Sequence, residues 1–160
     1  MRGIDKAFPG VQALAGVDFT LWPGEVHALL GENGAGKSTL MKVLAGVYQA
    51  DQGEIFLEGR LIRPASALEA QRLGIAMVMQ EFNLIPDLSV AENIALINRP
   101  EGPLFGRVRP RVLLAEAQAA LDRLGIRIAS CSLVRKLSVA QKQMVEIARA
   151  MSLSARVLVL

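Results

Sequence analysis

The sequence is poor in the residues on which several classes of protein depend. Its one cysteine, Cys131, can form no internal disulfide, and neither Cys131 nor the one histidine, His27, belongs to a metal-binding pattern. Aromatic residues make up only 4% of the chain, too few for stacking platforms that bind single-stranded nucleic acid. The longest stretch without a charged or strongly polar side chain, Leu73–Met79, is far shorter than the roughly 20 apolar residues of a membrane span. Residues 1–6 do not resemble a signal peptide. We therefore expect a cytoplasmic protein.

The overall composition favours one folded domain. A chain of 160 residues has the size of a typical domain, and with 52% hydrophobic and 21% charged residues it is too apolar to be disordered. The net charge is +3, from 18 basic and 15 acidic residues, and the basic residues form no dense block. The tightest basic set is Arg107, Arg109 and Arg111. We expect this set to be a solvated face and expect no nucleic-acid partner.

The first half of the chain alternates between strand and helix patterns. Val17–Trp22 and Glu25–Leu30 are typical of two strands joined by a proline–glycine turn, the second one buried. Helical spacing follows Lys37 and stops at Gly46. The apolar positions of this helix are Leu40, Val43 and Leu44. Gly53–Ile62 predicts a further hairpin, with its turn at Glu58 and Gly59.

The second half is predicted to be mainly helical between residues 86 and 152. Three capping-box patterns mark helix starts at Ser66–Glu69, Ser89–Glu92 and Ser138–Gln141. Pro110 suits the first position of another helix, with an apolar stripe of Leu114, Ala117, Leu121 and Leu124. The stripe expected for the last helix consists of Ala140, Met144, Ile147, Ala148 and Met151. Ile75–Met79 and Val157–Leu160 are expected to be strands.

One glycine-rich segment indicates a specific chemistry. Gly31–Ser38 fits the pattern G-x-x-x-x-G-K-[ST] between a predicted strand and a predicted helix, whereas a simple glycine-rich turn is the alternative. Glycines let successive N–H groups face phosphate oxygens at a helix N-terminus. Lys37 adds a full positive charge, and the Ser38 hydroxyl can bind Mg²⁺. The predicted nucleotide-binding residues here are Gly31, Glu32, Asn33, Gly34, Ala35, Gly36, Lys37, Ser38 and Thr39.

Two further segments narrow the choice among phosphate-loop proteins, which include GTPases, kinases and DNA-repair ATPases. The chain shows no Asn-Lys-x-Asp guanine signature. Leu137–Gln143 resembles the signature motif of ABC ATPases, and Val78–Glu81 resembles their Q-loop. The signature has Val139 and Ala140 in place of two glycines, a form familiar in the sugar-import group. Together with Lys6–Val11, these motifs resemble the ATPase subunits of bacterial monosaccharide importers of the ribose, xylose and galactose type, above all their first nucleotide-binding half.

The resemblance implies an α/β fold. The implied fold is that of an incomplete P-loop NTPase, with a RecA-like core, an ABC antiparallel β subdomain and a helical subdomain. Residues 1–85 would form the N-terminal part of the core with the β subdomain, residues 86–152 the helical subdomain with the signature helix, and residues 153–160 the start of the Walker B strand. The Walker B carboxylates would follow Leu160. We therefore expect a fragment of a longer ATPase, also clipped before Met1 and inactive in ATP hydrolysis by itself.

The resemblance also implies roles for single residues. Phe8 would stack on adenine, Lys37 and Gln80 would be catalytic, and Ser38 and Gln80 would bind Mg²⁺. The signature residues that would face the ATP of an opposing domain are Ser138, Val139, Ala140 and Gln141. The alternatives from the residues alone are a core phenylalanine at position 8, a polar strand end at position 80 and a simple helix cap at position 138.

The implied cofactors are ATP and Mg²⁺. The implied partners are a second nucleotide-binding domain, transmembrane permease subunits and, indirectly, a periplasmic sugar-binding protein, with the ATPase on the inner face of the cell membrane. The segment Phe82–Asn93 would meet the permease. Two other functions stay open: an ABC ATPase that acts on nucleic acid or ribosomes, and a regulatory ABC domain that only binds nucleotide.

Overall fold

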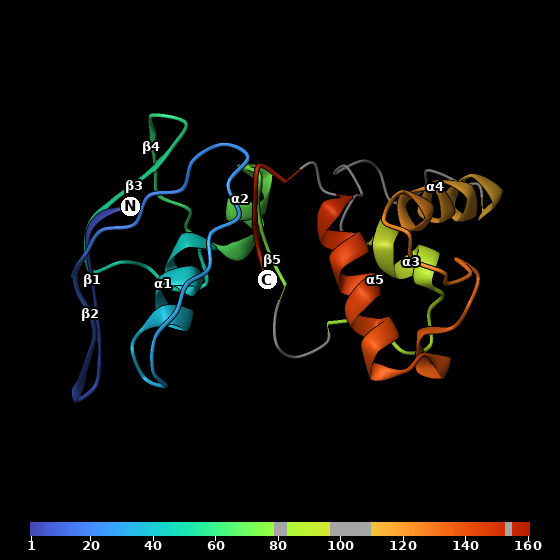
Figure 1. The fold of residues 1–160 in the computed structure, drawn as a ribbon, viewed down its shortest axis with the longest axis horizontal. Coiled ribbons are helices and arrows are strands. Elements are labelled where there is room, and N and C mark those ends of the chain that lie inside the picture. Colours follow the sequence, from blue (N-terminus) through green and yellow to red (C-terminus); the bar gives the residue numbers. More distant parts are fainter. Residues whose placement is uncertain (79–82, 97–109, 153–154) are drawn as a thin grey trace. The chain divides into compact units, whose positions relative to one another are not determined.

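The computed structural model describes two compact units, Met1–Ile75 and Ala76–Leu160 (Figure 1). The described residues are 1–78, 83–96, 110–152 and 155–160. No helix within them is long and apolar enough to cross a membrane. The functional division at residue 85 that the family resemblance implies stays a prediction.

The first unit contains a four-stranded antiparallel sheet in the order β2-β1-β3-β4. Its strands are β1 (Arg2–Phe8), β2 (Val11–Val17), β3 (Gln52–Leu57) and β4 (Arg60–Ile62). The β3–β4 pair confirms the predicted hairpin, with Ile55 opposite Ile62. Glu58 and Gly59 have φ values of 51° and 77°, and a tight two-residue hairpin turn requires such positive values.

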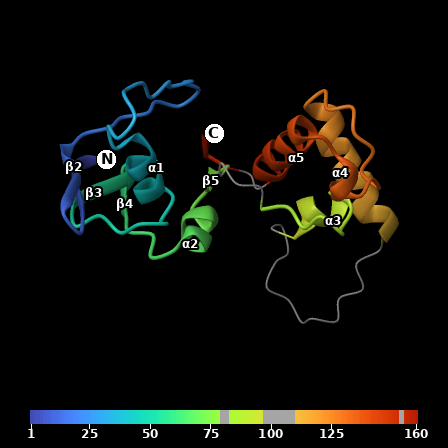
Figure 2. The ribbon, with the colours of Figure 1, turned by 90° about the horizontal axis from the view of Figure 1, so that it is seen from below.

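Two helices complete the first unit. Helix α1 (Lys37–Leu44) lies beside the sheet (Figure 2) and buries the three predicted apolar positions. Helix α2 (Ala67–Arg72) begins after Ser66, whose hydroxyl accepts a hydrogen bond from the Glu69 amide at 3.2 Å. The Glu69 carboxylate accepts from the Ala65 amide at 2.7 Å, not from the Ser66 amide. The predicted capping box is therefore only half formed.

The predicted strands over residues 17–22 and 25–30 are wrong. Strand β2 ends at Val17, and residues 18–36 contain no strand. Neither described sheet includes Glu25–Leu30, so the N–H and C=O groups of this segment have no ladder partners there. Val26 and Leu30 are 100% and 89% exposed instead of buried. An apolar segment becomes a buried strand only where a neighbouring strand pairs with it, and sequence patterning alone cannot supply that neighbour.

The second unit is mainly helical where it is described, as predicted. Its helices are α3 (Val90–Ala95), α4 (Pro110–Arg123), the 3-10 turn η1 (Val134–Lys136) and α5 (Val139–Met151). Pro110 begins α4, and Ser89 and Ser138 each form a complete capping box. A two-stranded sheet consists of β5 (Ile75–Met77) and β6 (Val157–Val159), which confirms both predicted strands within the described residues.

The helices of the second unit share one apolar core. The predicted stripe of α4 faces it, and Leu121 is fully buried. The predicted stripe of α5 is wrong in part, because Val145 and Ala148 are buried whereas Met144 and Met151 are 41% and 51% exposed. Adjacent residues lie about 100° apart around a helix, so α5 offers two overlapping apolar stripes. Its contacts with α3 and α4 select the stripe that contains Val145.

The capping box of α3 makes stability depend on pH. The hydroxyl and the amide of Ser89 donate to Glu92 Oε2 at 2.6 and 2.7 Å, and these bonds hold the pKa of Glu92 below its usual value. A depressed carboxyl pKa means that the stabilisation is present above the ordinary glutamate pKa and is lost as the pH falls through the lower, folded-state pKa. The Ser89→Ala variant should lower the free energy of unfolding at pH 7 by about 1 kcal/mol.

Denaturant titration of the full-length protein at several pH values tests this prediction. The difference between the wild type and Ser89→Ala should shrink as Glu92 becomes protonated in acid. In the Glu92→Gln variant, the Ser89→Ala change should have the same effect at every pH. A constant difference in the wild-type background would contradict the role of the Glu92 carboxylate.

Candidate functional site

The phosphate loop is an exposed turn that leads into α1. Residues 31–35 are exposed, so packed side chains do not cover the loop. Gly34 and Gly36 have φ values of 89° and 81°, in the left-handed region that glycine adopts at little cost. Gly36 is the N-cap of α1, and no side chain caps the helix and no acidic residue lies in its first turn. The N-terminus of α1 therefore presents N–H groups and a positive partial charge to an incoming anion.

Strand β2 fixes the position of this loop. A Cβ atom at Gly36 would lie 2.5 Å from the carbonyl oxygen of Ala13 and 2.9 Å from Leu14 Cδ2. Both contacts are too short for any side chain, and the nearer one is with the main chain, which cannot move aside easily. Gly36 is thus required both for its backbone conformation and for the space that β2 leaves.

Lys37 folds back over the loop that precedes it. Its ammonium group donates to the carbonyl oxygens of Gly31 and Glu32 at 2.6 and 2.7 Å. These bonds place a full positive charge beside the helix N-terminus. Ser38 is exposed in the first turn of α1, and Thr39 next to it is half-buried. The predicted loop residues therefore lie together at the N-terminus of α1, and their binding of a nucleotide stays a prediction.

Phe8 lies at the end of β1 against an aromatic residue that sequence reasoning missed. Its ring meets the Tyr48 ring edge to face, with the centroids 5.2 Å apart and the planes at 72°. The amide of Tyr48 donates to the carbonyl oxygen of Lys42, so Tyr48 is fixed to the C-terminal end of α1. Tyr48 is the only tyrosine of the chain and follows the helix stop at Gly46, but nothing local in the sequence relates it to Phe8.

Asp51 holds the end of β1 in place next to Phe8. One oxygen accepts from the Lys6 ammonium at 2.6 Å and the other from the Ala7 amide at 2.7 Å. The Lys6 ammonium, followed by the Ala7 amide, keeps the pKa of Asp51 below its usual value. Lys6 itself lies over the Phe8 ring, 5.6 Å from the centroid. Phe8 is thus half-buried and restrained, not a fully buried core residue.

The signature residues lie at the N-terminus of α5. The Ser138 hydroxyl accepts from the Gln141 amide at 3.3 Å, and the Ser138 amide donates to Gln141 Oε1 at 2.9 Å. All four signature residues are exposed, with Val139 at 68%. The hydroxyl accepts in this capping bond, so its proton stays available as a donor. Ser138 can therefore cap its own helix and also present a donor to an anion.

Three further residues remain: Gln80, to which a role was assigned, and His27 and Cys131, to which none was. Gln80 lies outside the described residues, as does most of the Q-loop motif. His27 lies 2.9 Å from Glu25 Oε1, in an exposed segment and not in a strand. Cys131 is exposed and unpaired. Among the described residues, no group of three or more His, Cys, Asp and Glu side chains could hold a metal ion.

The class of protein follows from comparison with known families. The family model described as "ABC transporter" matches residues 14–160, and the chain belongs to this family. The ADP conformation of MJ1267, an ATP-binding cassette of an ABC transporter, has a TM-score of 0.80 and 29% identity, over 98% of this chain and 65% of that one. The fold is therefore that of an ABC ATPase cassette, of the α/β P-loop class.

Two relatives narrow the comparison to ATP-binding proteins of sugar import. The ribose import ATP-binding protein RbsA 1 of Rubrobacter xylanophilus is 57% identical over the whole chain. A putative ribose/galactose/methyl galactoside import ATP-binding protein of Burkholderia ambifaria is 52% identical, again over the whole chain. The chain spans 32% and 31% of the length of these two proteins, about a third of each. The likeness to sugar-import ATP-binding proteins that the motifs predicted is confirmed.

The contact between Gly36 and β2 leads to a testable difference between two glycines of the same loop. Both Gly34 and Gly36 have a positive φ, but a Cβ atom added at Gly36 would meet β2, whereas one added at Gly34 would face open space. The Gly34→Ala variant should lose about 1–2 kcal/mol of stability through backbone strain alone. The Gly36→Ala variant should lose more and should displace the loop from β2.

Calorimetric titration of the full-length protein with ATP, together with thermal unfolding, measures both effects. Gly36→Ala should weaken ATP binding well beyond the effect of Gly34→Ala. Equal losses in the two variants would show that the approach of β2 does not shape the loop.

Proposed function

We propose that the protein is the ATP-binding subunit of a bacterial monosaccharide importer and couples binding and hydrolysis of Mg–ATP to sugar uptake. The observation that carries the proposal is the exposed glycine loop at the uncapped N-terminus of α1, with the Lys37 ammonium folded across it. The names of the two relatives, which concern import of ribose, galactose and methyl galactoside, support the transport role and the substrate class. They also favour import over an ABC ATPase that acts on nucleic acid.

The phosphate loop binds the triphosphate in this proposal. Main-chain N–H groups of residues 31–39 donate to the phosphate oxygens, and Lys37 neutralises charge on the outer phosphates. An ammonium group has three N–H donors, and two of them go to the carbonyls of Gly31 and Glu32. The third is left for a phosphate oxygen. During transfer of the outer phosphoryl group to water, this charge stabilises the developing negative charge.

Magnesium fits the oxygen donors of the loop. Ser38 presents an exposed hydroxyl in the first turn of α1, next to the place of the phosphates, and Mg²⁺ prefers oxygen ligands that include phosphate. We assign Ser38 and Gln80 as the protein ligands. When bound, the ion neutralises phosphate charge. Gln80 also belongs to the catalytic group through its position in the Q-loop motif.

Phe8 provides the stacking surface for adenine. Tyr48 touches the ring edge to face and the Lys6 ammonium lies over the ring, so both restrain it. Asp51 restrains the main chain immediately before Phe8. A ring that is already restrained loses less conformational entropy when the base stacks on it.

The signature helix serves a second subunit. Ser138, Val139, Ala140 and Gln141 face the ATP that an opposing nucleotide-binding domain holds, and the helix N-terminus with the Ser138 hydroxyl binds its outer phosphate. Transmembrane permease subunits contact the segment Phe82–Asn93, and a periplasmic protein delivers the sugar to them. The ATPase works on the inner face of the cell membrane.

Replacement of Lys37 tests the proposed activity. Lys37→Ala in the full-length importer should abolish ATP-dependent sugar uptake, because the loop then lacks its only side-chain cation among residues 31–39. Uptake of labelled ribose, xylose and galactose into vesicles loaded with ATP measures the effect. Lys136→Ala, which removes an exposed lysine from η1, is the matched control and should leave uptake unchanged. Undiminished uptake by Lys37→Ala would refute the assignment.

Replacement of Phe8 tests the adenine surface. Phe8→Ala should weaken ATP binding by about 1–3 kcal/mol, the usual value of a base stacked on an aromatic ring. Phe8→Tyr keeps a ring and should bind within about twofold of the wild type, since only the π face is needed. Phe56→Ala removes another ring of the same sheet and should leave the affinity unchanged. Titration with ATP and with triphosphate alone separates base stacking from phosphate binding, because only the ATP affinity should fall.

A further inference from the structure

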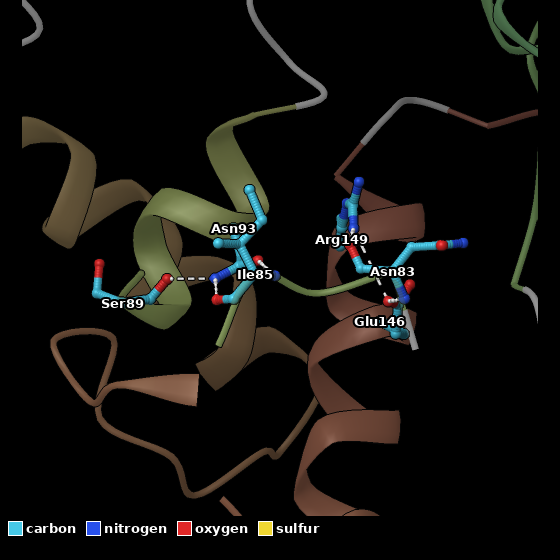
Figure 3. A network of polar contacts seen from close by, with 6 residues as sticks. All are labelled: Asn83, Ile85, Ser89, Asn93, Glu146 and Arg149. Atoms are coloured by element: carbon cyan, nitrogen blue, oxygen red, sulfur yellow. Dashed lines mark hydrogen bonds and ion pairs between the residues drawn. The ribbon is translucent and has the colours of Figure 1, made fainter. Parts of the chain in front are cut away.

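Two charged side chains of α5 grip the main chain of a residue far away in the sequence. The Asn83 amide donates to Glu146 Oε1 at 2.9 Å, and Arg149 Nη1 donates to the Asn83 carbonyl at 2.8 Å (Figure 3). Glu146 and Arg149 lie one turn apart on the helix, so the two side chains reach Asn83 together. We call Glu146 and Arg149 the α5 clamp. Both bonds involve main-chain atoms, so the clamp fixes the path of the chain at position 83 whatever its side chain does.

The clamp is costly for the protein to maintain. Glu146 is only 8% exposed, and the Glu146 and Arg149 side chains lie 3.8 Å apart at their nearest charged atoms, too far for a strong hydrogen bond. Arg149 Nε is buried and has no hydrogen-bond partner among the described residues. Burial lowers the pKa of Arg149, and the Glu146 carboxylate only partly offsets this effect. Apolar residues at these two positions would stabilise a helix core at least as well. The charged pair therefore contributes more to the position of the Asn83 main chain than to the stability of the fold.

A second set of side-chain hydrogen bonds holds the main chain of the same segment at Ile85, two residues after Asn83. Fully buried Asn93 of α3 accepts from the Ile85 amide at 2.7 Å and donates to the Ile85 carbonyl at 3.1 Å and to the Ser89 carbonyl at 3.0 Å (Figure 3). The N–H and the C=O of Asn83 and of Ile85 are thus all bonded to side chains. The segment between them cannot shift without carrying α5 and α3 with it or breaking several buried hydrogen bonds.

The gripped segment buries Leu84 in the apolar core and exposes the residues that follow it. Ile85 is 45% exposed although it is a large apolar residue, and Pro86 and Asp87 are exposed as well. Asn83 comes three residues after Gln80 in the sequence. Ser138, at the start of α5, lies eight residues before Glu146, a distance of about 12 Å along a helix. A rigid helix thus connects the clamp to the signature.

We infer that Glu146 and Arg149 are positioning residues that join the segment around Ile85 to the signature helix, so that contact of a membrane partner with this segment changes how Ser138 is presented. This inference rests on the proposed function as an importer subunit. When the membrane partner displaces Ile85, Asn83 moves with it. The two hydrogen bonds of the clamp then displace α5, including its N-terminus, where Ser138 lies. Without the clamp, the segment can yield while α5 stays in place.

Four variants of the full-length ATPase, reconstituted with its permease and binding protein in lipid vesicles, test the inference. Glu146→Leu removes the oxygen that binds the Asn83 amide, whereas Glu146→Gln keeps an oxygen acceptor in the same place. Arg149→Met removes the other bond. Leu121→Ala is the control, because it opens a cavity in the same apolar core without removing either hydrogen bond to Asn83. ATP hydrolysis is measured with and without the sugar-loaded binding protein.

The expected result is a loss of coupling without loss of nucleotide binding. Glu146→Leu and Arg149→Met should bind ATP as the wild type does, but the stimulation of hydrolysis by sugar should fall at least about fivefold, the lower end of usual allosteric coupling. Glu146→Gln should keep most of the stimulation. Leu121→Ala should lower the melting temperature yet keep the stimulation. An unchanged stimulation in Glu146→Leu, or an equal loss in Leu121→Ala, would overturn the inference.

A second measurement separates this inference from the proposed function. If hydrolysis by the wild type does not respond to any sugar, the importer role has failed, and the clamp is judged by amide hydrogen exchange. Exchange at Asn83, Ile85 and the first turn of α5 should then rise in Glu146→Leu by more than in Leu121→Ala. Unchanged exchange at all three places would show that Glu146 does not hold the segment to the helix.

Discussion

The close contact between Gly36 and strand β2 sets the geometry on which the nucleotide site depends. The Ala13 carbonyl leaves no space for a side chain at position 36, so the loop can lie against the sheet only with glycine there. That approach places the first turn of α1 and Lys37 beside the same hairpin whose other strand ends at Phe8. The loop and the aromatic ring, although well separated in the sequence, thereby belong to one compact unit.

The second unit uses polar contacts in a comparable way. Helices α3 and α5 start with complete capping boxes, which fix where each helix begins, while Glu146, Arg149 and Asn93 fix the chain between Asn83 and Ser89. Apolar packing around Leu121 and Val145 supplies the stability. The buried polar groups instead determine the position of the main chain between Asn83 and Ser89 relative to α3 and α5. Apolar contacts specify such a position poorly.

Local signals in the sequence were sufficient for part of this structure. The capping boxes, Pro110 at a helix start, the hairpin at Glu58 and the glycine loop each depend on residues close together in the chain, and all are found as predicted apart from one half-formed box. Features that depend on distant residues were missed or wrong. Examples are the unpaired segment Glu25–Leu30, the inward face of α5, and the contacts of Tyr48, Asp51 and the α5 clamp, because no local pattern encodes the partner that completes them.

The exposed segment Glu25–Leu30 lies directly ahead of the glycine loop but does not shape it. The contacts that shape the glycine loop join residues between Ala13 and Lys37, and none of them requires the segment ahead of the loop to be paired. Val26 and Leu30 can therefore stay exposed while the loop keeps its shape. The geometry of the phosphate site is thus insensitive to whether this segment pairs with a strand.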